Sequence, residues 1–78
     1  MYKRQAQDDA EAVRFFKLAA DQGFAMAEHN LGVMYANGRG VARDVAEAIR
    51  WYERAAAKGH EKAKAALARL RRATPRPN

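Results

Sequence analysis

Small and apolar residues recur along this chain at helical spacing and predict four helices. The stripe of the helix expected over about residues 45–58 consists of Ala48, Ile49, Tyr52, Ala55 and Ala56. These positions stand at i, i+1, i+4, i+7 and i+8, so they share one helical face. Comparable stripes predict helices over about residues 9–22, 25–37 and 61–72.

The stripes also predict how these helices pack. The inward positions of the second and fourth helices are Ala27, Leu31, Met34 and Tyr35, and Ala63, Ala66, Leu67 and Leu70. Gly32 has no side chain, which lets a neighbouring helix approach closely. Small residues on facing stripes imply closely spaced antiparallel helices. We expect the space between successive hairpins to be filled by Phe15, Phe16, Trp51 and Tyr52. Packing of each unit on its neighbours alone is typical of a stacked repeat array.

Polar residues and glycines mark the expected helix ends. Asp44 with Glu47 three residues later resembles a capping box, and Asp8 with Glu11 repeats the spacing. Gly59 and Gly23 each follow a last turn, where a left-handed residue is favoured. The run 38–41, Gly-Arg-Gly-Val, interrupts the chain between the second and third helices.

A 36-residue repeat underlies these similarities. Residues 8–32 and 44–68 are identical at ten of 25 positions, and Val13, Phe15 and Phe16 are matched by Ile49, Trp51 and Tyr52. Alanine contributes some of this identity, but the paired Asp, Glu, Arg, Gly and aromatic positions are informative. A repeat of this length indicates a stacked helical array.

One dense motif in the chain resembles the Sel-one-like repeat family, which is related to the tetratricopeptide repeats. The motif reads Ala27-x3-Leu31-Gly32-x2-Tyr35-x2-Gly38-x-Gly40-Val41-x2-Asp44-x3-Ala48-x2-Trp51-Tyr52-x2-Ala55-Ala56-x2-Gly59-His60. The resemblance implies an all-α fold, a right-handed α-solenoid of antiparallel helix pairs. It also implies a scaffold or adaptor that binds proteins or peptides.

The resemblance divides the chain into one full unit (about 25–60) between two partial ones. We expect an array over residues 8–73, a truncated lead-in over 1–7 and a disordered tail over 74–78. Ala68 stands where Gly32 would be repeated, and Arg71 where Tyr35 would be. These departures predict that the last helix is a terminal cap.

Composition narrows the function classes. The chain has no cysteine, which excludes disulfides and thiol chemistry, and no apolar run long enough to suggest a membrane span.

His29 and His60 lack the ligand spacing of a metal site, so we expect no metal and no cofactor. No serine is present, and the acidic residues have capping roles, so we expect no enzymatic activity. The Gly38–Gly40 run lacks the rest of a phosphate-binding signature, and a tight turn explains it better.

Charge is uneven along the chain and suggests a partner. The net charge is +6, yet residues 1–36 carry −1 and residues 37–78 carry +7. By analogy with tetratricopeptide arrays, the concave positions are Met26, His29, Val33 and Asn37, with Lys62, Arg69 and Arg72 on the last helix. Such a surface would suit an acidic or carboxylate-terminated peptide. The alternative is that these cations simply solvate a terminal helix and complement its dipole.

Two further expectations concern partners. Nucleic acid, or another anionic surface, is the alternative partner for the basic half, although no recognised reading motif accompanies the charge. The first helix lacks a preceding partner, so Phe15 or Phe16 should be partly exposed. We therefore expect self-association through this N-terminal end, or exchange of a helix between protomers.

Overall fold

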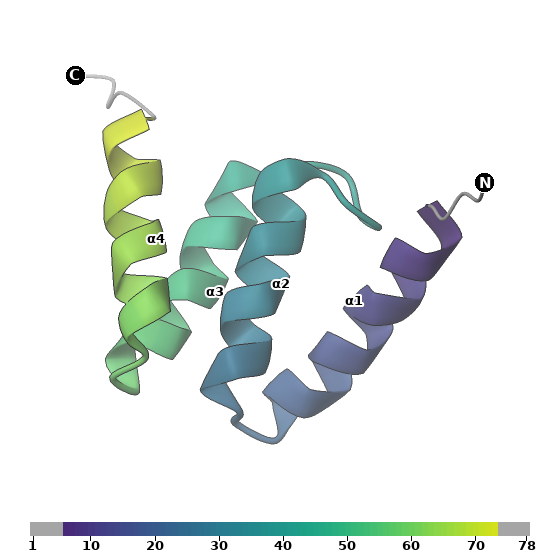
Figure 1. Cartoon of the computed structure of the whole chain (residues 1–78), viewed down its shortest axis with the longest axis horizontal. Coiled ribbons are helices and arrows are strands. Elements are labelled where there is room, and N and C mark those ends of the chain that lie inside the picture. Colours follow the sequence, from purple (N-terminus) through teal and green to yellow (C-terminus); the bar gives the residue numbers. More distant parts are fainter. Residues whose placement is uncertain (1–5, 74–78) are drawn as a thin grey trace.

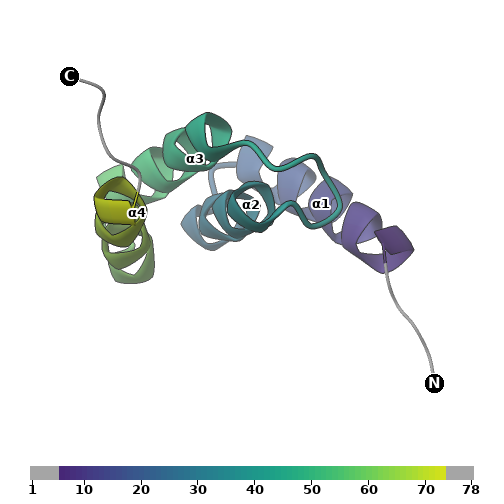
Figure 2. The same cartoon turned by 90° about the horizontal axis from the view of Figure 1, so that it is seen from above.

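A computed structural model of the chain describes residues 6–73, with side chains from Asp8 onward. It contains α1 (Ala6–Asp21), α2 (Ala25–Asn37), α3 (Val45–Ala57) and α4 (Glu61–Ala73), and this part of the chain has no strand. Each helix packs on the next in chain order (Figure 1). Seen from above, α2 and α4 lie on the same side of α3 (Figure 2). The all-α solenoid of helix pairs is confirmed.

The core follows the predicted stripes and has two parts. One joins α1 and α2, and its buried residues are Val13, Ala20, Ala27, Leu31 and Met34. The other joins α3 and α4, and its buried residues are Ala48, Tyr52, Ala55, Ala63, Ala66 and Leu67. Tyr35 of α2 packs against both parts, so the two helix pairs share one continuous core.

The two pairs approach each other closely at Gly32. A Cβ atom on Gly32 would lie 2.5 Å from Cε1 and 2.6 Å from Cδ1 of Tyr52, so the tyrosine ring rests directly on the glycine backbone. Tyr52 is 5% exposed as a result. The missing side chain therefore brings α2 and α3 together, as the sequence predicted.

Helices α1 and α3 end in the same way. Gly23 and Gly59 have φ angles of 89° and 88°. After α3, the Gly59 N–H donates to Ala56 O at 2.9 Å and the His60 N–H donates to Ala55 O at 3.2 Å. This is the Schellman pattern, and it satisfies carbonyl groups that the helix end leaves free. His60 thus closes the helix through its backbone.

The two predicted capping boxes have different outcomes. Asp44 is the N-cap of α3, and its Oδ1 accepts a hydrogen bond from the Glu47 N–H at 3.1 Å. The same role for Asp8 is wrong, because α1 already begins at Ala6 and Asp8 lies in its first turn. Ala6 and Gln7 are good helix formers, and no glycine turn precedes Asp8 to stop the helix, as the 38–41 run does before Asp44.

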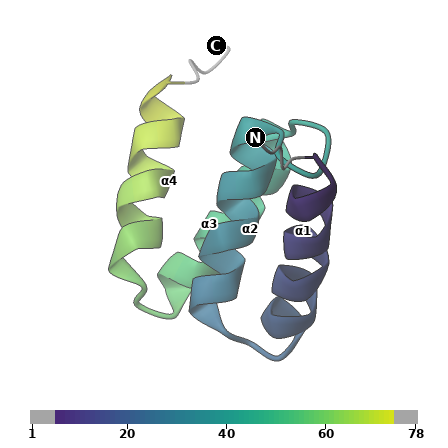
Figure 3. The same cartoon turned by 45° about the vertical axis from the view of Figure 1, so that its right-hand side comes forward.

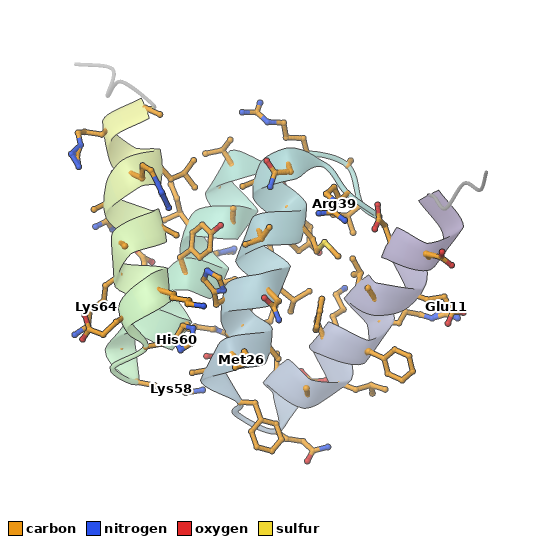
Figure 4. All side chains as sticks on the ribbon, in the orientation of Figure 1. Glu11, Met26, Arg39, Lys58, His60 and Lys64 are labelled. Atoms are coloured by element: carbon orange, nitrogen blue, oxygen red, sulfur yellow. The ribbon has the colours of Figure 1, made fainter. Side chains whose placement is uncertain are left out.

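The 38–41 run is a turn that packs against α1. Gly40 has a φ of 75°, and a Cβ there would lie 2.5 Å from the carbonyl of Asp9. The Arg39 guanidinium pairs with the Asp9 carboxylate at 3.2 Å, on the side of the loop that faces α1 (Figure 4). The connection between α2 and α3 is thus packed against α1.

Phe15 does not fill the space between hairpins, and that expectation is wrong for this residue. It is 66% exposed, whereas Phe16 and Trp51 are half-buried. The reason is that no helix within residues 6–73 covers the outer face of α1, which agrees with the expected exposure at this end. The tail over 74–78 and most of the lead-in over 1–7 lie outside the described residues.

Candidate functional site

The space between α2 and α4 is the candidate site. Helices α2 and α4 both pack on α3, but α4 stands apart from α2 (Figure 3). Two hollows of about 340 and 250 Å³ lie along this gap. We name the whole surface the α2–α4 groove. The first hollow is lined by Met26, His29, Asn30, His60, Glu61 and Lys62, and the second by Ala36, Asn37, Tyr52, Ala66, Arg69, Leu70 and Ala73.

Aromatic rings form the wall of the first hollow. The imidazole of His29 lies 5.2 Å from that of His60 and 5.6 Å from the ring of Tyr52, centroid to centroid. Met26 and His60 project from facing helix ends on the two sides of this hollow (Figure 4). His29 is thus an α2 side chain that contacts the second helix pair from within the groove.

The protonation of His29 reflects this setting. Burial is the largest influence and lowers its pKa below the ordinary 6.5; the neighbouring His60 and Lys62 lower it further, while a hydrogen bond with Asn30 opposes them. Burial lowers the pKa because it disfavours the charged imidazolium. At neutral pH His29 therefore presents an uncharged ring to the groove.

The second hollow combines apolar walls with polar rims. Tyr52 is buried, and burial raises the pKa of its phenol above 10.0 although Arg69 acts in the opposite direction. The phenol therefore stays protonated at neutral pH. On the opposite rim, the Asn37 side chain donates to Val33 O at 3.0 Å, which fixes the orientation of its amide.

Four of the five cations of α4 fall into two groups. Lys64 pairs with Glu61 at 3.3 Å and Arg71 pairs with Glu53 at 2.6 Å. Lys62 and Arg69 line the hollows, and neither forms an ion pair with a carboxylate within residues 8–73. The groove therefore carries positive charge that the described chain leaves uncompensated.

The structure brings most of the predicted binding residues to this groove. Met26, His29 and Lys62 line the first hollow, and Asn37 and Arg69 line the second. Val33 is half-buried against the α3–α4 core, between the two. Arg72 is exposed but lines neither hollow, because it stands on α4 three residues from Arg69, displaced to one side of the stripe.

Sequence reasoning missed part of the groove. Asn30 and Glu61 were not considered, and His60 and Tyr52 were assigned structural roles only. Periodicity does place Asn30 one turn from Met26. No sequence signal shows that His60, in the α3–α4 turn, meets His29 of α2, because that contact depends on how α2 crosses the second helix pair.

A further hollow of about 590 Å³ lies on the opposite side of α3. It is lined by Glu47, Arg50, Trp51, Glu53, Arg54 and Ala57. The Arg54 guanidinium lies 4.7 Å from the centre of the Trp51 ring, a cation–π contact. The two carboxylates and two guanidinium groups that line it balance in number, whereas Lys62 and Arg69 outnumber Glu61 in the α2–α4 groove.

Two other kinds of feature, a cluster of metal ligands and a membrane-spanning helix, are absent from residues 6–73. Among them no three His, Cys, Asp or Glu side chains come together as metal ligands. None of the four helices combines the length and apolar character needed to cross a bilayer.

The comparisons with known proteins account for the 36-residue repeat. No curated protein matches the chain significantly. The family model described as "Sel1 repeat" matches residues 3–24 and 25–60, so the second match spans one whole unit, α2 with α3. Sel1 repeats are a non-enzymatic repeat family that generally serves in protein interaction. The chain therefore belongs to the Sel1 repeat family.

Proposed function

We propose that the chain is a scaffold module whose α2–α4 groove binds an acidic peptide segment of a partner protein. The observation that supports this most directly is the pair of cations, Lys62 and Arg69, that line the groove without a carboxylate partner in the described chain. The spacing of seven residues along α4 sets them about 10 Å apart. A segment with two carboxylates could contact both.

The groove also offers apolar contact. Met26 is 64% exposed, and Leu70 and the Tyr52 ring line the second hollow. An acidic segment with an apolar residue between its carboxylates would therefore desolvate Met26 or Leu70 while its charges meet the cations. Such a combination gives specificity through charge and affinity through burial.

Asn30 and Asn37 suit an extended peptide. Each lines one of the hollows, and an amide side chain can both donate to and accept from a peptide backbone. Neutral His29 adds a donor and an acceptor at the first hollow. These groups recognise the peptide backbone, whereas Lys62 and Arg69 recognise its charge.

Fluorescence anisotropy with labelled peptides tests the proposal. The probe is a set of eight-residue peptides with two Asp or Glu spaced to span Lys62 and Arg69, and an apolar residue between them. Replacing Lys62 or Arg69 by Ala should weaken binding about fivefold to tenfold each, since a charge-assisted contact contributes about 1–1.5 kcal/mol. Lys64→Ala is the matched control, because Lys64 already pairs with Glu61.

The same experiment separates this proposal from nucleic-acid binding. Duplex DNA is titrated in parallel at several salt concentrations. Tight DNA binding with a steep salt dependence, together with no affinity for the acidic peptides, would overturn the proposal in favour of the alternative. Peptide binding that Lys64→Ala weakens as much as Lys62→Ala does would also overturn it.

A further inference from the structure

Two histidines face each other in the first hollow of the α2–α4 groove. His29 projects from α2 and His60 from the turn between α3 and α4, and their ring centroids lie 5.2 Å apart. Lys62, in the first turn of α4, lines the same hollow. Imidazole is the side chain whose ordinary titration falls between pH 5 and 8, so the charge at this end of the groove can change with pH.

Neither the carboxylate beside His29 on α2 nor the one that lines the hollow is free to balance a positive charge on this histidine. Glu28, the preceding residue of α2, is 2% exposed, and its Oε2 lies 2.8 Å from Lys58 Nζ. Glu61 lines the hollow, but its side chain is 83% exposed and pairs with Lys64 at 3.3 Å. A carboxylate so exposed is strongly screened by water. A protonated His29 therefore lacks a counter-ion within the described chain.

The remaining groups around His29 are neutral or positive. Tyr52 of α3, whose ring lies 5.6 Å from that of His29, has a phenol that stays protonated because burial raises its pKa. Burial lowers the pKa of His29, and the nearby charges of His60 and Lys62 lower it further. A hydrogen bond with Asn30 acts in the other direction. None of the residues that line this hollow comes from α1. On its own, the described chain thus disfavours the imidazolium both by burial and by charge.

We propose that the first hollow binds the carboxylate of the acidic peptide together with a proton, with the carboxylate between Lys62 and His29 and the proton on His29. The carboxylate supplies the counter-ion that the described chain lacks at this position. An opposite charge close to an imidazole stabilises its protonated form, so peptide binding raises the pKa of His29. This inference rests on the proposed function and adds a dependence on pH to it.

Proton uptake makes the affinity depend on pH in a definite direction. Because the complex holds the proton more tightly than the free protein does, protons are taken up on binding and the affinity rises as the pH falls. The rise ends below the lowered pKa of free His29, where both states are protonated. At the other end of the groove, Arg69 keeps its charge and Tyr52 keeps its proton throughout this range. The Lys62 end of the groove is therefore the end that responds to pH.

Fluorescence anisotropy with the acidic eight-residue peptides at pH 7.5, 6.5 and 5.5 tests the inference. The affinity should be about threefold to tenfold higher at pH 5.5 than at pH 7.5, the gain expected of one further charge-assisted contact. A peptide with Asn and Gln in place of Asp and Glu is the matched control and should show no such gain. Circular dichroism at each pH checks that the chain remains folded.

Calorimetry at pH 6.5 measures the proton directly. Titrations in two buffers of different ionisation enthalpy should give a net uptake of a fraction of one proton per bound peptide. His29→Gln should remove both this uptake and the gain in affinity at pH 5.5. Arg69→Ala, at the other end of the groove, should weaken binding by a similar factor at every pH and leave the uptake unchanged.

The outcomes separate this inference from the proposed function. Equal affinity at all three pH values, with no proton uptake, would overturn the inference and leave the proposed function standing. A dependence on pH that His60→Gln removes and His29→Gln retains would also overturn it, since the proton would then lie on His60. Peptides that bind at no pH would overturn the proposed function, and this inference with it.

Discussion

Individual residues set the distances on which the fold depends. The ring of Tyr52 rests on Gly32. The sequence predicted a close approach of a neighbouring helix at Gly32, because glycine has no side chain, but it did not identify Tyr52 as the contact. The meeting of His29 with His60 was not predicted. It depends on the crossing of α2 over the second pair, which the spacing of residues along one helix does not determine.

Gly32→Ala should destabilise the protein by about 1–3 kcal/mol, although alanine is the better helix former. The new methyl group would lie 2.5 Å from the Tyr52 ring, so the ring or the helix must move. Urea unfolding followed by circular dichroism measures the change. Exposed Ala68, the counterpart on α4, supplies the control: Ala68→Gly should lower stability by only about 1 kcal/mol. A stabilised Gly32→Ala variant would show that the close contact is absent.

The stability of the fold should fall in mild acid through His29. Its folded pKa lies below the unfolded value of 6.5, so below pH 6.5 the unfolded chain binds a proton that the folded chain does not. This contribution is complete above pH 6.5 and is lost as the pH falls toward the lowered pKa. Unfolding free energies measured between pH 7.5 and 5 should show the decrease, and His29→Gln should reduce it.

A charge variant checks the cause of that shift. Lys62→Met should raise the pKa of His29, measured from its imidazole proton resonances, because Lys62 disfavours the imidazolium. Lys64→Met should leave the pKa unchanged, since Lys64 pairs with Glu61 on the outer edge of α4 (Figure 4) and is not among the groups that act on His29. Identical titrations for the two variants would contradict this account of the groove.

At the scale of elements, the sequence predicted helix ends where a specific chemical signal exists. The bounds of α2, α3 and α4 follow within a residue from glycines and from the Asp44 cap. The start of α1 was misplaced because the repeat suggested that Asp8 must act like Asp44. The two aspartates differ in what precedes them: a glycine turn before Asp44, and helix-forming residues before Asp8.

Asp44→Ala should lower stability by about 1 kcal/mol, because the Glu47 N–H loses its acceptor. Thermal unfolding provides the comparison. Asp21→Ala is the matched control: it removes an exposed carboxylate at the C-terminal end of α1, where negative charge is unfavourable, and should be neutral or slightly stabilising. Equal losses in the two variants would argue against a capping role for Asp44.

The contact between the two helix pairs includes an ion pair. Glu28 of α2 is 2% exposed, and Lys58 Nζ lies 2.8 Å from its Oε2 and donates to Gly23 O at 3.0 Å. Lys58→Ala should cost about 1–3 kcal/mol, since it leaves a buried carboxylate unpaired. Lys64→Ala, which breaks the exposed pair with Glu61, should cost at most about 0.5 kcal/mol. Similar costs in chemical denaturation would mean that Glu28 is not buried as described.

At the scale of the whole molecule, stacking two helix pairs produces surfaces that neither pair has alone. The α2–α4 groove exists because both helices pack mainly on α3. The groove is lined by four residues that sequence analogy predicted as concave positions, Met26, His29, Lys62 and Arg69, and their role in binding is part of the proposal. The analogy also predicted Arg72, which lines neither hollow, because a charged residue near a helix end fits a helical stripe whether or not it faces the groove.

Amide chemical-shift mapping with an acidic, carboxylate-spaced peptide tests the central claim most directly. The account predicts that the largest shifts fall on Met26, His29 and Asn37 of α2 and on Lys62 and Arg69 of α4, with α1 unaffected. Shifts centred instead on Arg50 and Arg54, across α3 from the groove, would contradict it.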